Sequence, residues 1–370
     1  MKLKINDDFK ENFLLFLSSL EKEKTGYYYP ATQGLTSAGS NLTLGFSCFA
    51  LKCMYILDAW DDLSTQKKTE WINLINSFQD NQINNLPKNS FIDKDYYSII
   101  KKFDINTEAK RQAKKILNRN YKKKNVEIDE FIRAETKQAI SSLHQVGFTN
   151  NLHYESDIIK TDSVTSYLNS LDWTKPWNSG AQFSGLCVFL ETQDFRSSNY
   201  LKNKNELSTF SEELLSLETG CYFKGSIPSD SEIINGTMKI LTGLDWLNIK
   251  VHLPDKLIDT CLRIAPSNKG CDLVDIVYIL YICSKQTNYR KKEIVSYLDG
   301  LLESISKHYF VKEGGFSYYL NQSQIFYYGL RITKGEPVPD IHGSMLLLWA
   351  LSMVNEMKEN QDIKLRIIKP

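Results

Sequence analysis

Long apolar runs are missing from this sequence, and so is an excess of either charge. No window approaches the roughly 18 consecutive apolar residues of a membrane span, and residues 1–8 lack the apolar stretch of a secretory signal. The 45 Lys and Arg residues balance 44 Asp and Glu residues, so the net charge gives no bulk attraction to nucleic acid or to anionic membranes. We therefore expect a cytoplasmic protein with no membrane span and no nucleic-acid partner.

Closely spaced cysteine pairs and flexible linkers are missing too. The seven cysteines are widely spaced, none belongs to a CxxC pair, and most lie among apolar residues. This pattern favours buried, reduced thiols over disulfides or a zinc site. The chain has only nine prolines, and no proline- or serine-rich segment divides it. We expect a single domain that covers residues 1–370.

The familiar nucleotide-binding and hydrolase motifs are also absent. The sequence has no GxGxxG after a strand, no GxxxxGK[ST], no HExxH and no GxSxG. These absences disfavour Rossmann redox chemistry, P-loop nucleotide hydrolysis, zincin proteolysis and α/β-hydrolase chemistry. We expect neither a metal ion nor an organic cofactor.

Helical periodicity, in contrast, covers most of the chain. Apolar residues recur on one helical face in several segments and fill almost every position in others, whereas no alternation is sustained enough for a sheet. In the basic zone 101–124, the helical spacing of the aliphatic residues favours a solvated helix face over a nucleic-acid site. The sequence therefore predicts an all-α fold. The amphipathic segments are 9–22, 68–78, 208–217, 254–264 and 293–309, and the apolar ones are 44–57, 131–146, 180–192 and 272–284.

A loose internal repeat organises these helices. A polar-faced helix ends at a glycine and a short aromatic run, a loop follows, and a more apolar helix comes next. Six apolar helices are expected to begin near residues 40, 131, 180, 236, 272 and 342. Repeated helix pairs of this kind can close into a ring, with the apolar helices inside and the amphipathic ones outside. The repeat is clearest at TGYYY (25–29), TGCYF (219–223) and EGGFS (313–317).

The C-terminal third carries a resemblance to a known superfamily. Its features are EGGFS at 313–317, the aromatic segment at 327–329, and Asp340-Ile-His-Gly343 at the start of an apolar helix. With these features the chain resembles the α/α-toroid proteins, which include terpenoid cyclases and protein prenyltransferases. The architecture is shared with carbohydrate-active (α/α)6 barrels such as sugar epimerases, uronyl epimerases and polysaccharide lyases. The resemblance implies a single (α/α)6-type toroid of inner and outer helices.

The isoprenoid branch of this resemblance lacks its catalytic motifs here. The segment from Asp58 to Asp62 (DAWDD) has neither the DxDD spacing of one cyclase class nor the third carboxylate of DDxxD. It also follows an inner helix, and so we expect it at the wrong end of the barrel. Cys271, Asp272 and His342 are residue types that prenyltransferases use to hold zinc, but their order differs. These departures favour the carbohydrate-active branch.

A ring of parallel inner helices would gather their N-terminal ends at one mouth. Unpaired backbone N–H groups and helix dipoles there favour anions. Polar side chains in the first turns are therefore the best candidates for chemistry, and those expected to transfer protons are His342, Asp275, Asp272 and Asp340. Each also has a structural interpretation. Asp340 and Asp272 are suitable helix caps, His342 can bond a buried carbonyl, and Asp275 can pair with a nearby cation.

A second set of residues is suited to binding a substrate at that mouth. Arg133 offers a clamp for a carboxylate or phosphate, and it can equally form an internal network with a glutamate. The loop and helix start from 172 to 182 include Gln182 and two tryptophans, Trp173 and Trp177. The tryptophan rings can stack on sugars or instead fix the loop by burial. Tyr328 belongs to the aromatic segment that can line the mouth.

Together these residues predict an enzyme that acts on a carbohydrate, neutral or anionic, supplied as a small molecule or a glycan. The expected chemistry is acid–base: epimerisation, elimination or glycosidic hydrolysis, of which the last needs two carboxylates from Asp272, Asp275 and Asp340. Two alternatives stay open. One is an isoprenoid enzyme of the terpenoid cyclase or prenyltransferase type, with an aromatic cavity and a buried acid. The other is a non-catalytic toroid that binds a glycan or a protein.

Overall fold

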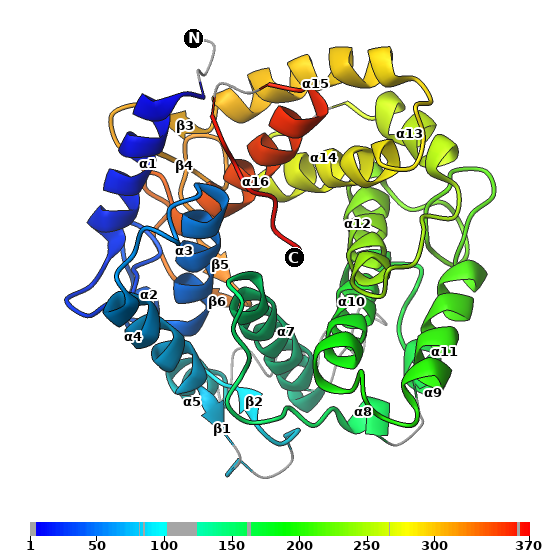
Figure 1. The fold of residues 1–370 in the computed structure, drawn as a ribbon, viewed down its shortest axis with the longest axis horizontal. Coiled ribbons are helices and arrows are strands. Elements are labelled where there is room, and N and C mark those ends of the chain that lie inside the picture. The colour runs from blue at the N-terminus through cyan, green and yellow to red at the C-terminus, as the bar shows by residue number, and fades with distance from the viewer. Residues whose placement is uncertain are drawn as a thin grey trace, which may run out of the picture.

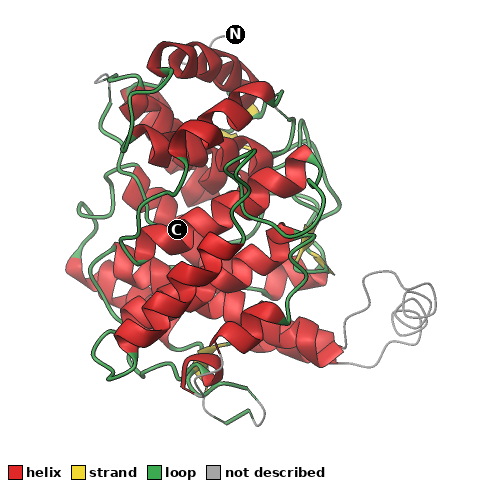
Figure 2. Ribbon diagram, turned by 90° about the vertical axis from the view of Figure 1, so that its right-hand side faces the viewer, coloured by secondary structure: helices red, strands yellow, loops and turns green. Residues whose placement is uncertain are grey.

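Helices make up most of the protein, as the view in Figure 2 shows. The computed structural model describes residues 5–80, 82–83, 86–101, 124–160, 164–265, 267–360 and 363–370. Within these residues every strand is two residues long and belongs to an antiparallel pair. The pairs are β1–β2 (Gln79–Asp80, Ser90–Phe91), β3–β4 (Tyr309–Phe310, Gly315–Phe316) and β5–β6 (Phe326–Tyr327, Leu330–Arg331). The predicted all-α class is confirmed.

Six helices surround the centre of the molecule (Figure 1). Each packs against the next in chain order, and the last packs against the first, so that the six close into a ring. These inner helices are α3 (Leu44–Ile56), α7 (Lys124–Gln145), α10 (Pro176–Gln193), α12 (Asp230–Trp246), α14 (Gly270–Ser284) and α16 (Ile341–Met357). Most of them, but not α7, are apolar on nearly every face because they are covered by their two ring neighbours and by helices outside.

The amphipathic helices lie outside this ring and bury one face against it (Figure 1). In α1, for example, Phe9, Phe13 and Phe16 are buried while Leu15 on the opposite face is exposed. The longer outer helices are α1 (Asp7–Leu20), α4 (Thr65–Asn76), α11 (Tyr200–Glu213), α13 (Pro254–Arg263) and α15 (Lys291–Ser306). Shorter ones are α2 (Ser37–Asn41), α5 (Lys94–Lys101), α8 (Asp157–Lys160) and α9 (Val164–Asn169).

The repeat seen in the sequence has a physical counterpart in three tight hairpins. After α1, α11 and α15, antiparallel bridges join residues seven positions apart: 21 with 28, 215 with 222, and 309 with 316. Each hairpin turns at a glycine with positive φ, namely Gly26, Gly220 and Gly314. A Cβ on these glycines would approach Trp71 of α4, Leu257 of α13 and Asn12 of α1 within 3 Å. Each hairpin therefore seats one outer helix against another.

Several helix boundaries differ from those expected. α7 and α12 begin at Lys124 and Asp230, earlier than the expected 131 and 236, because their first turns are polar and carry no apolar signal. α3 begins at Leu44, four residues after the expected start, where the backbone N–H groups of Thr43 and Leu44 both donate to Asp93. The basic run expected to form a solvated helix falls on residues 102–123, which lie outside the described residues.

The remaining predictions on cysteines and membrane spans can be compared directly with the structure. All seven cysteines are free, and every one except Cys271 is buried, which confirms the expectation of reduced core thiols. No helix in the described part of the chain combines the length and the apolar character required to cross a bilayer.

Candidate functional site

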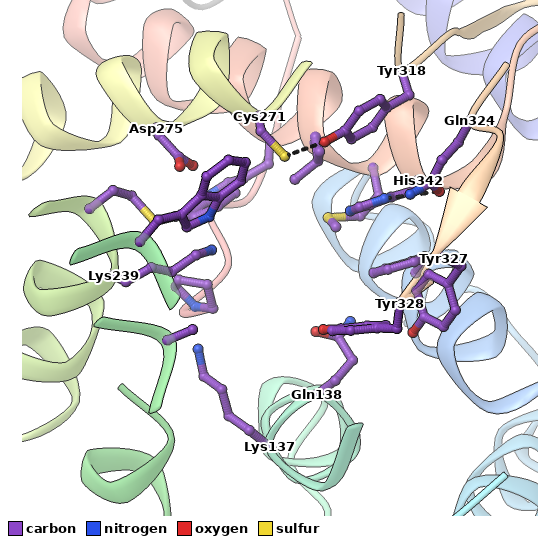
Figure 3. Close-up of a pocket in the computed structure, with 18 of the residues that line it drawn as sticks. Lys137, Gln138, Lys239, Cys271, Asp275, Tyr318, Gln324, Tyr327, Tyr328 and His342 are labelled. Atoms are coloured by element: carbon purple, nitrogen blue, oxygen red, sulfur yellow. Dashed lines mark hydrogen bonds between the residues drawn. The ribbon is translucent and has the colours of Figure 1, made fainter. Parts of the chain in front are cut away.

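A cavity of about 600 Å³ opens inside the ring and is bordered by side chains from all six inner helices. Residues from the first turns of α10, α12, α14 and α16 reach it: Trp177, Glu232, Cys271 and His342. The N-terminal ends of these helices thus share one concave site, as expected of a ring. Figure 3 shows the labelled side chains around it.

The C-terminal segment contributes to the opposite side of this cavity. Ile368 and Pro370 line it, and the indole N–H of Trp246 donates to the carbonyl of Pro370 at 2.7 Å. Asp58, which follows the C-terminal end of α3, pairs with Lys364 and Arg366 of the same segment. The acidic DAWDD segment therefore anchors this tail and does not line the cavity.

His342 stands on the cavity wall with one ring nitrogen fixed. Its Nδ1 lies 3.1 Å from Oε1 of Gln324, and its ring stacks on Phe49 at 4.4 Å. With the amide oxygen as acceptor, Nδ1 carries the hydrogen and Nε2 keeps its lone pair. Burial, followed by the charges of Lys239 and Lys52, lowers the pKa of His342 to about 3. The imidazole is therefore neutral at physiological pH and able to accept a proton.

Asp275 occupies the adjacent wall, on α14, which packs against α16 (Figure 3). Its side chain lines the cavity and makes no hydrogen bond or ion pair within the described residues, although the residue is only 3% exposed. Burial raises the pKa of Asp275 to about 7, and Lys239 opposes this shift. A carboxyl group in this state is able to donate a proton near neutrality.

The other two predicted proton-transfer residues do not line the cavity. Asp340 caps α16 by accepting from the backbone N–H of Gly343 at 2.8 Å, and its second oxygen accepts from Tyr318 and Gln324 at 2.7 and 3.0 Å. Asp272 accepts from Ser231 and Asn235 and so ties the start of α14 to α12. The contacts of both aspartates are those of structural residues.

Three of the predicted binding residues also lie outside the cavity lining. Arg133 donates to Gln182 at 3.0 Å and to the hydroxyl of Tyr167 at 3.1 Å, and that hydroxyl donates to the same Gln182 oxygen. The expected internal network therefore exists, with a glutamine and a tyrosine where a glutamate was considered. Trp173 is 3% exposed and donates to the carbonyl of Leu168, which fixes its loop by burial.

Trp177 and Tyr328, the remaining predicted binding residues, do line the cavity. Trp177 is 37% exposed at the start of α10, where its backbone N–H donates to Glu232. Tyr328 lies at the turn between β5 and β6, with positive φ and half of its surface exposed. Both rings are free to contact a ligand.

Three lysines that were not predicted converge on the same space. Lys52 on α3 is almost fully buried and donates to Gln138 and Ser141, both at 3.2 Å. Lys137 on α7 and Lys239 on α12 direct their side chains into the cavity (Figure 3) and make no hydrogen bond or ion pair within the described residues. Burial lowers the pKa of Lys52 to about 8; Cys48 opposes this shift, and the charge of Lys239 contributes to it. The cavity therefore holds a local excess of basic groups in a chain of nearly balanced charge.

Two residues of the lining also carry buried donors without a partner. Nε2 of Gln138 and the indole Nε1 of Trp349 are shielded from solvent and have no hydrogen-bond partner among the described residues. Buried polar atoms in native proteins are nearly always satisfied by protein, water or ligand. Neither atom is accessible from the cavity in this conformation, so it is the lysines that favour a ligand rich in acceptor oxygens.

A buried carboxyl–phenol pair supports the wall below Tyr328. Tyr327 donates to Glu135 of α7, and burial raises the pKa of this glutamate to about 8. On another wall, Sγ of Cys271 lies 2.8 Å from the hydroxyl of Tyr318 (Figure 3). Within the described residues, no group of three His, Cys, Asp or Glu side chains is arranged to hold a metal ion.

Neither a protein-family model, nor a curated protein, nor a solved structure matches the chain.

Proposed function

We propose that this protein is an enzyme that binds an anionic carbohydrate in the cavity and acts on it by acid–base chemistry. One observation carries the proposal: Lys137 and Lys239 line the cavity without a hydrogen bond or ion pair to any described residue, in company with a neutral imidazole and a buried carboxyl group. Such a site is complementary to a sugar that carries a carboxylate or phosphate.

The scaffold we propose is an (α/α)6 toroid. Two features support it: the six inner helices close on one another, and the three glycine hairpins each seat an outer helix against another. Active sites on such scaffolds depend on the residues in the ring, not on the fold alone.

The electrostatics favour an anion over a neutral sugar. Lys239 is the cation shared by the site, because its charge lowers the pKa of Lys52, Lys137 and His342. Bringing these groups together without a counter-ion is unfavourable, and a bound carboxylate or phosphate would relieve that repulsion. Trp177 and Tyr328 add exposed aromatic faces suited to the apolar side of a sugar ring.

The placement of the acid and the base favours proton transfer at two positions of one bound substrate. Asp275 and His342 come from the neighbouring helices α14 and α16 and border the same cavity (Figure 3). His342 would abstract a proton through Nε2, and protonated Asp275 would donate one. Of the three carboxylates expected to form a hydrolytic pair, only Asp275 lines the cavity, which favours epimerisation or elimination over hydrolysis.

The isoprenoid alternative is less well supported by this lining. The cavity does have the aromatic side chains and the buried acid that this alternative predicts. A carbocation in this cavity, however, would meet the positive charge of Lys239, and like charges in a partly buried site repel strongly. We therefore keep carbocation chemistry as an outcome of the test.

Calorimetric titration with a panel of ligands tests the proposal. The panel contains uronic acids and their oligomers, sugar phosphates, the matching neutral sugars, and an isoprenoid diphosphate. We expect the anionic sugars to bind and their neutral analogues to bind weakly. Lys239→Met should weaken binding about ten-fold or more, since a charge-assisted hydrogen bond contributes about 1.5–3 kcal/mol. Lys250→Met, which removes an exposed lysine just after α12, is the matched control.

Turnover is then followed by NMR in D2O with the sugars that bind. Epimerisation or elimination next to a carboxylate incorporates solvent deuterium or forms a double bond. His342→Ala and Asp275→Asn should each lower the rate about 10²–10⁴-fold while thermal unfolding shows a folded chain. Binding without turnover would support the non-catalytic alternative. Equal binding of neutral and anionic sugars, or preference for the isoprenoid, would contradict the proposal.

A further inference from the structure

Lys137, like Lys239, is open to the cavity to a degree that the buried Lys52 is not. It lies in the middle of α7, its side chain points into the open space (Figure 3), and it has no hydrogen-bond or ion-pair partner within the described residues. Lys52, by comparison, is enclosed and donates to two neutral oxygens. Lys137 therefore combines access to a ligand with an amine that no acceptor engages.

We propose that Lys137 is a nucleophilic amine that forms a reversible imine with an aldehyde or ketone carrying an anionic group. The inference rests on the proposed function for its ligand class, because the open-chain form of an anionic sugar is such a carbonyl compound. Lys239 and Lys52 would hold the anionic group while the carbonyl carbon meets Lys137.

The reaction needs no oxidant or reductant. The lone pair of the neutral Lys137 amine attacks the carbonyl carbon, and the oxygen takes up a proton to give a carbinolamine. Loss of that oxygen as water, with both amine hydrogens leaving on it, forms the C=N bond. Protonated Asp275 and Nε2 of His342, which line the same cavity, are the groups that would supply and accept these protons.

The surroundings favour the neutral amine that this step requires. Burial, and then the charges of Lys239 and Lys52, lower the pKa of Lys137 well below its usual range. A neighbouring cation and removal from water are the two ways in which proteins activate lysine as a nucleophile. Lys239 is the cation shared by the other cavity groups, so its position suits anion binding better than carbonyl attack.

Reductive trapping on the whole protein tests the inference. The chain is treated at pH 7 with equimolar pyridoxal 5′-phosphate, an aldehyde that carries a phosphate, and then with borohydride. Peptide mapping by mass spectrometry measures the labelled fraction of every lysine. We expect one label per chain, at Lys137, formed at least about ten-fold faster than at exposed Lys250, since each unit by which the pKa falls raises the neutral amine about ten-fold.

Two variants and a second probe sharpen the assignment. Lys137→Arg keeps a long side chain with N–H donors but cannot form an imine. It should lose the label while anionic sugars still bind in the calorimeter. Lys239→Met should slow labelling by pyridoxal 5′-phosphate more than labelling by pyridoxal, which lacks the phosphate. The peptide map of the labelled parent protein, without any substitution, decides the assignment even where a variant does not fold.

The result that overturns the inference is labelling of Lys137 no faster than of Lys250, or labelling of Lys239 or Lys52 in its place. Its failure is distinct from failure of the proposed function. Anionic sugars that bind without any label at Lys137 would contradict the imine alone. A label at Lys137 in a protein that binds no anionic sugar would contradict the carbohydrate assignment, while it would still support Lys137 as a nucleophile.

Discussion

Two buried aspartates at the starts of neighbouring helices have opposite surroundings. Around Asp340, at the start of α16, three backbone N–H groups donate to the carboxylate. Two come from the preceding loop, at Tyr318 and Gln324, and one from the helix itself, at Gly343. Around Asp275, one turn into α14, the carboxyl group borders a cavity and has no hydrogen bond to any residue that the structure describes. The first region uses its acid to hold the fold together, whereas the second leaves its polar groups unsatisfied. Unsatisfied buried groups of this kind mark the place where a ligand supplies the missing partners.

The largest effect should follow from breaking the satisfied region. Asp340→Ala removes the acceptor of Gly343, Tyr318 and Gln324 and leaves three N–H groups without a partner. At about 1–3 kcal/mol for each buried unsatisfied donor, the free energy of unfolding should fall by about 4 kcal/mol or more, as measured by urea denaturation at pH 7.

Asp230 provides the control for this prediction. It also lies at the start of an inner helix, but it is exposed, so Asp230→Ala should cost less than about 1 kcal/mol. Equal losses in the two variants would show that Asp340 has no special part in holding the loop to α16.

Removing the acid of the unsatisfied region, by Asp275→Asn, should raise the free energy of unfolding, and the gain should depend on pH. The folded pKa of Asp275, about 7, exceeds that of an unfolded aspartate, so the folded chain binds more protons between about pH 4 and pH 7. The contribution of this residue to stability is therefore lost as pH rises through that window. Asp275→Asn should be about 2 kcal/mol more stable than the parent at pH 8 and nearly equal to it at pH 4.

Urea denaturation of both proteins at several pH values measures this difference. Asp340 and Glu135 also have raised pKa values, but they are present in both chains, so the comparison isolates Asp275. A difference that stays constant from pH 4 to pH 8 would contradict the assignment of a protonated acid to this wall.

A smaller effect is expected at the hydrogen-bonded network of Arg133. Arg133→Met breaks bonds to Gln182 and Tyr167 in a partly exposed place and should cost about 1 kcal/mol of stability. Because this arginine does not line the cavity, the affinity for anionic sugars should stay unchanged. A loss of affinity for anionic sugars as large as that in Lys239→Met would instead show that Arg133 binds the anion, as the sequence predicted.

The positions of the helices could be predicted from the sequence more fully than the residues of the site. Apolar periodicity located the inner helices, because residues covered on all sides must be apolar whatever their neighbours are. It also led to His342, Asp275, Trp177 and Tyr328, which do meet at one cavity. The sequence could not tell which of Trp173 and Trp177 is buried and which lines the cavity. A spacing of four residues would place both on one helical face, and only the true start of α10 shows that Trp173 lies before the helix.

The lysines show what a sequence can and cannot reveal. Lys52 and Lys239 each interrupt an apolar run, LKCMYI and TMKIL, and a lone charge inside a buried helix is a detectable signal. Lys137 stands among polar residues on α7, where nothing distinguishes it from a solvated position. Only the closing of the ring turns that part of α7 towards the other two lysines.

The smallest predicted effect concerns the repulsion among these lysines. Lys239→Met removes the charge that lowers the pKa of both Lys52 and His342, so in the unliganded chain it should raise stability, by about 1 kcal/mol or less. The same change should raise the pKa of His342, which an NMR titration of its ring protons measures. Lys250→Met, far from the cavity lining, should move neither quantity. An unchanged His342 pKa in Lys239→Met would mean that burial alone keeps the imidazole neutral, and the cationic cluster would then lose its part in tuning the base.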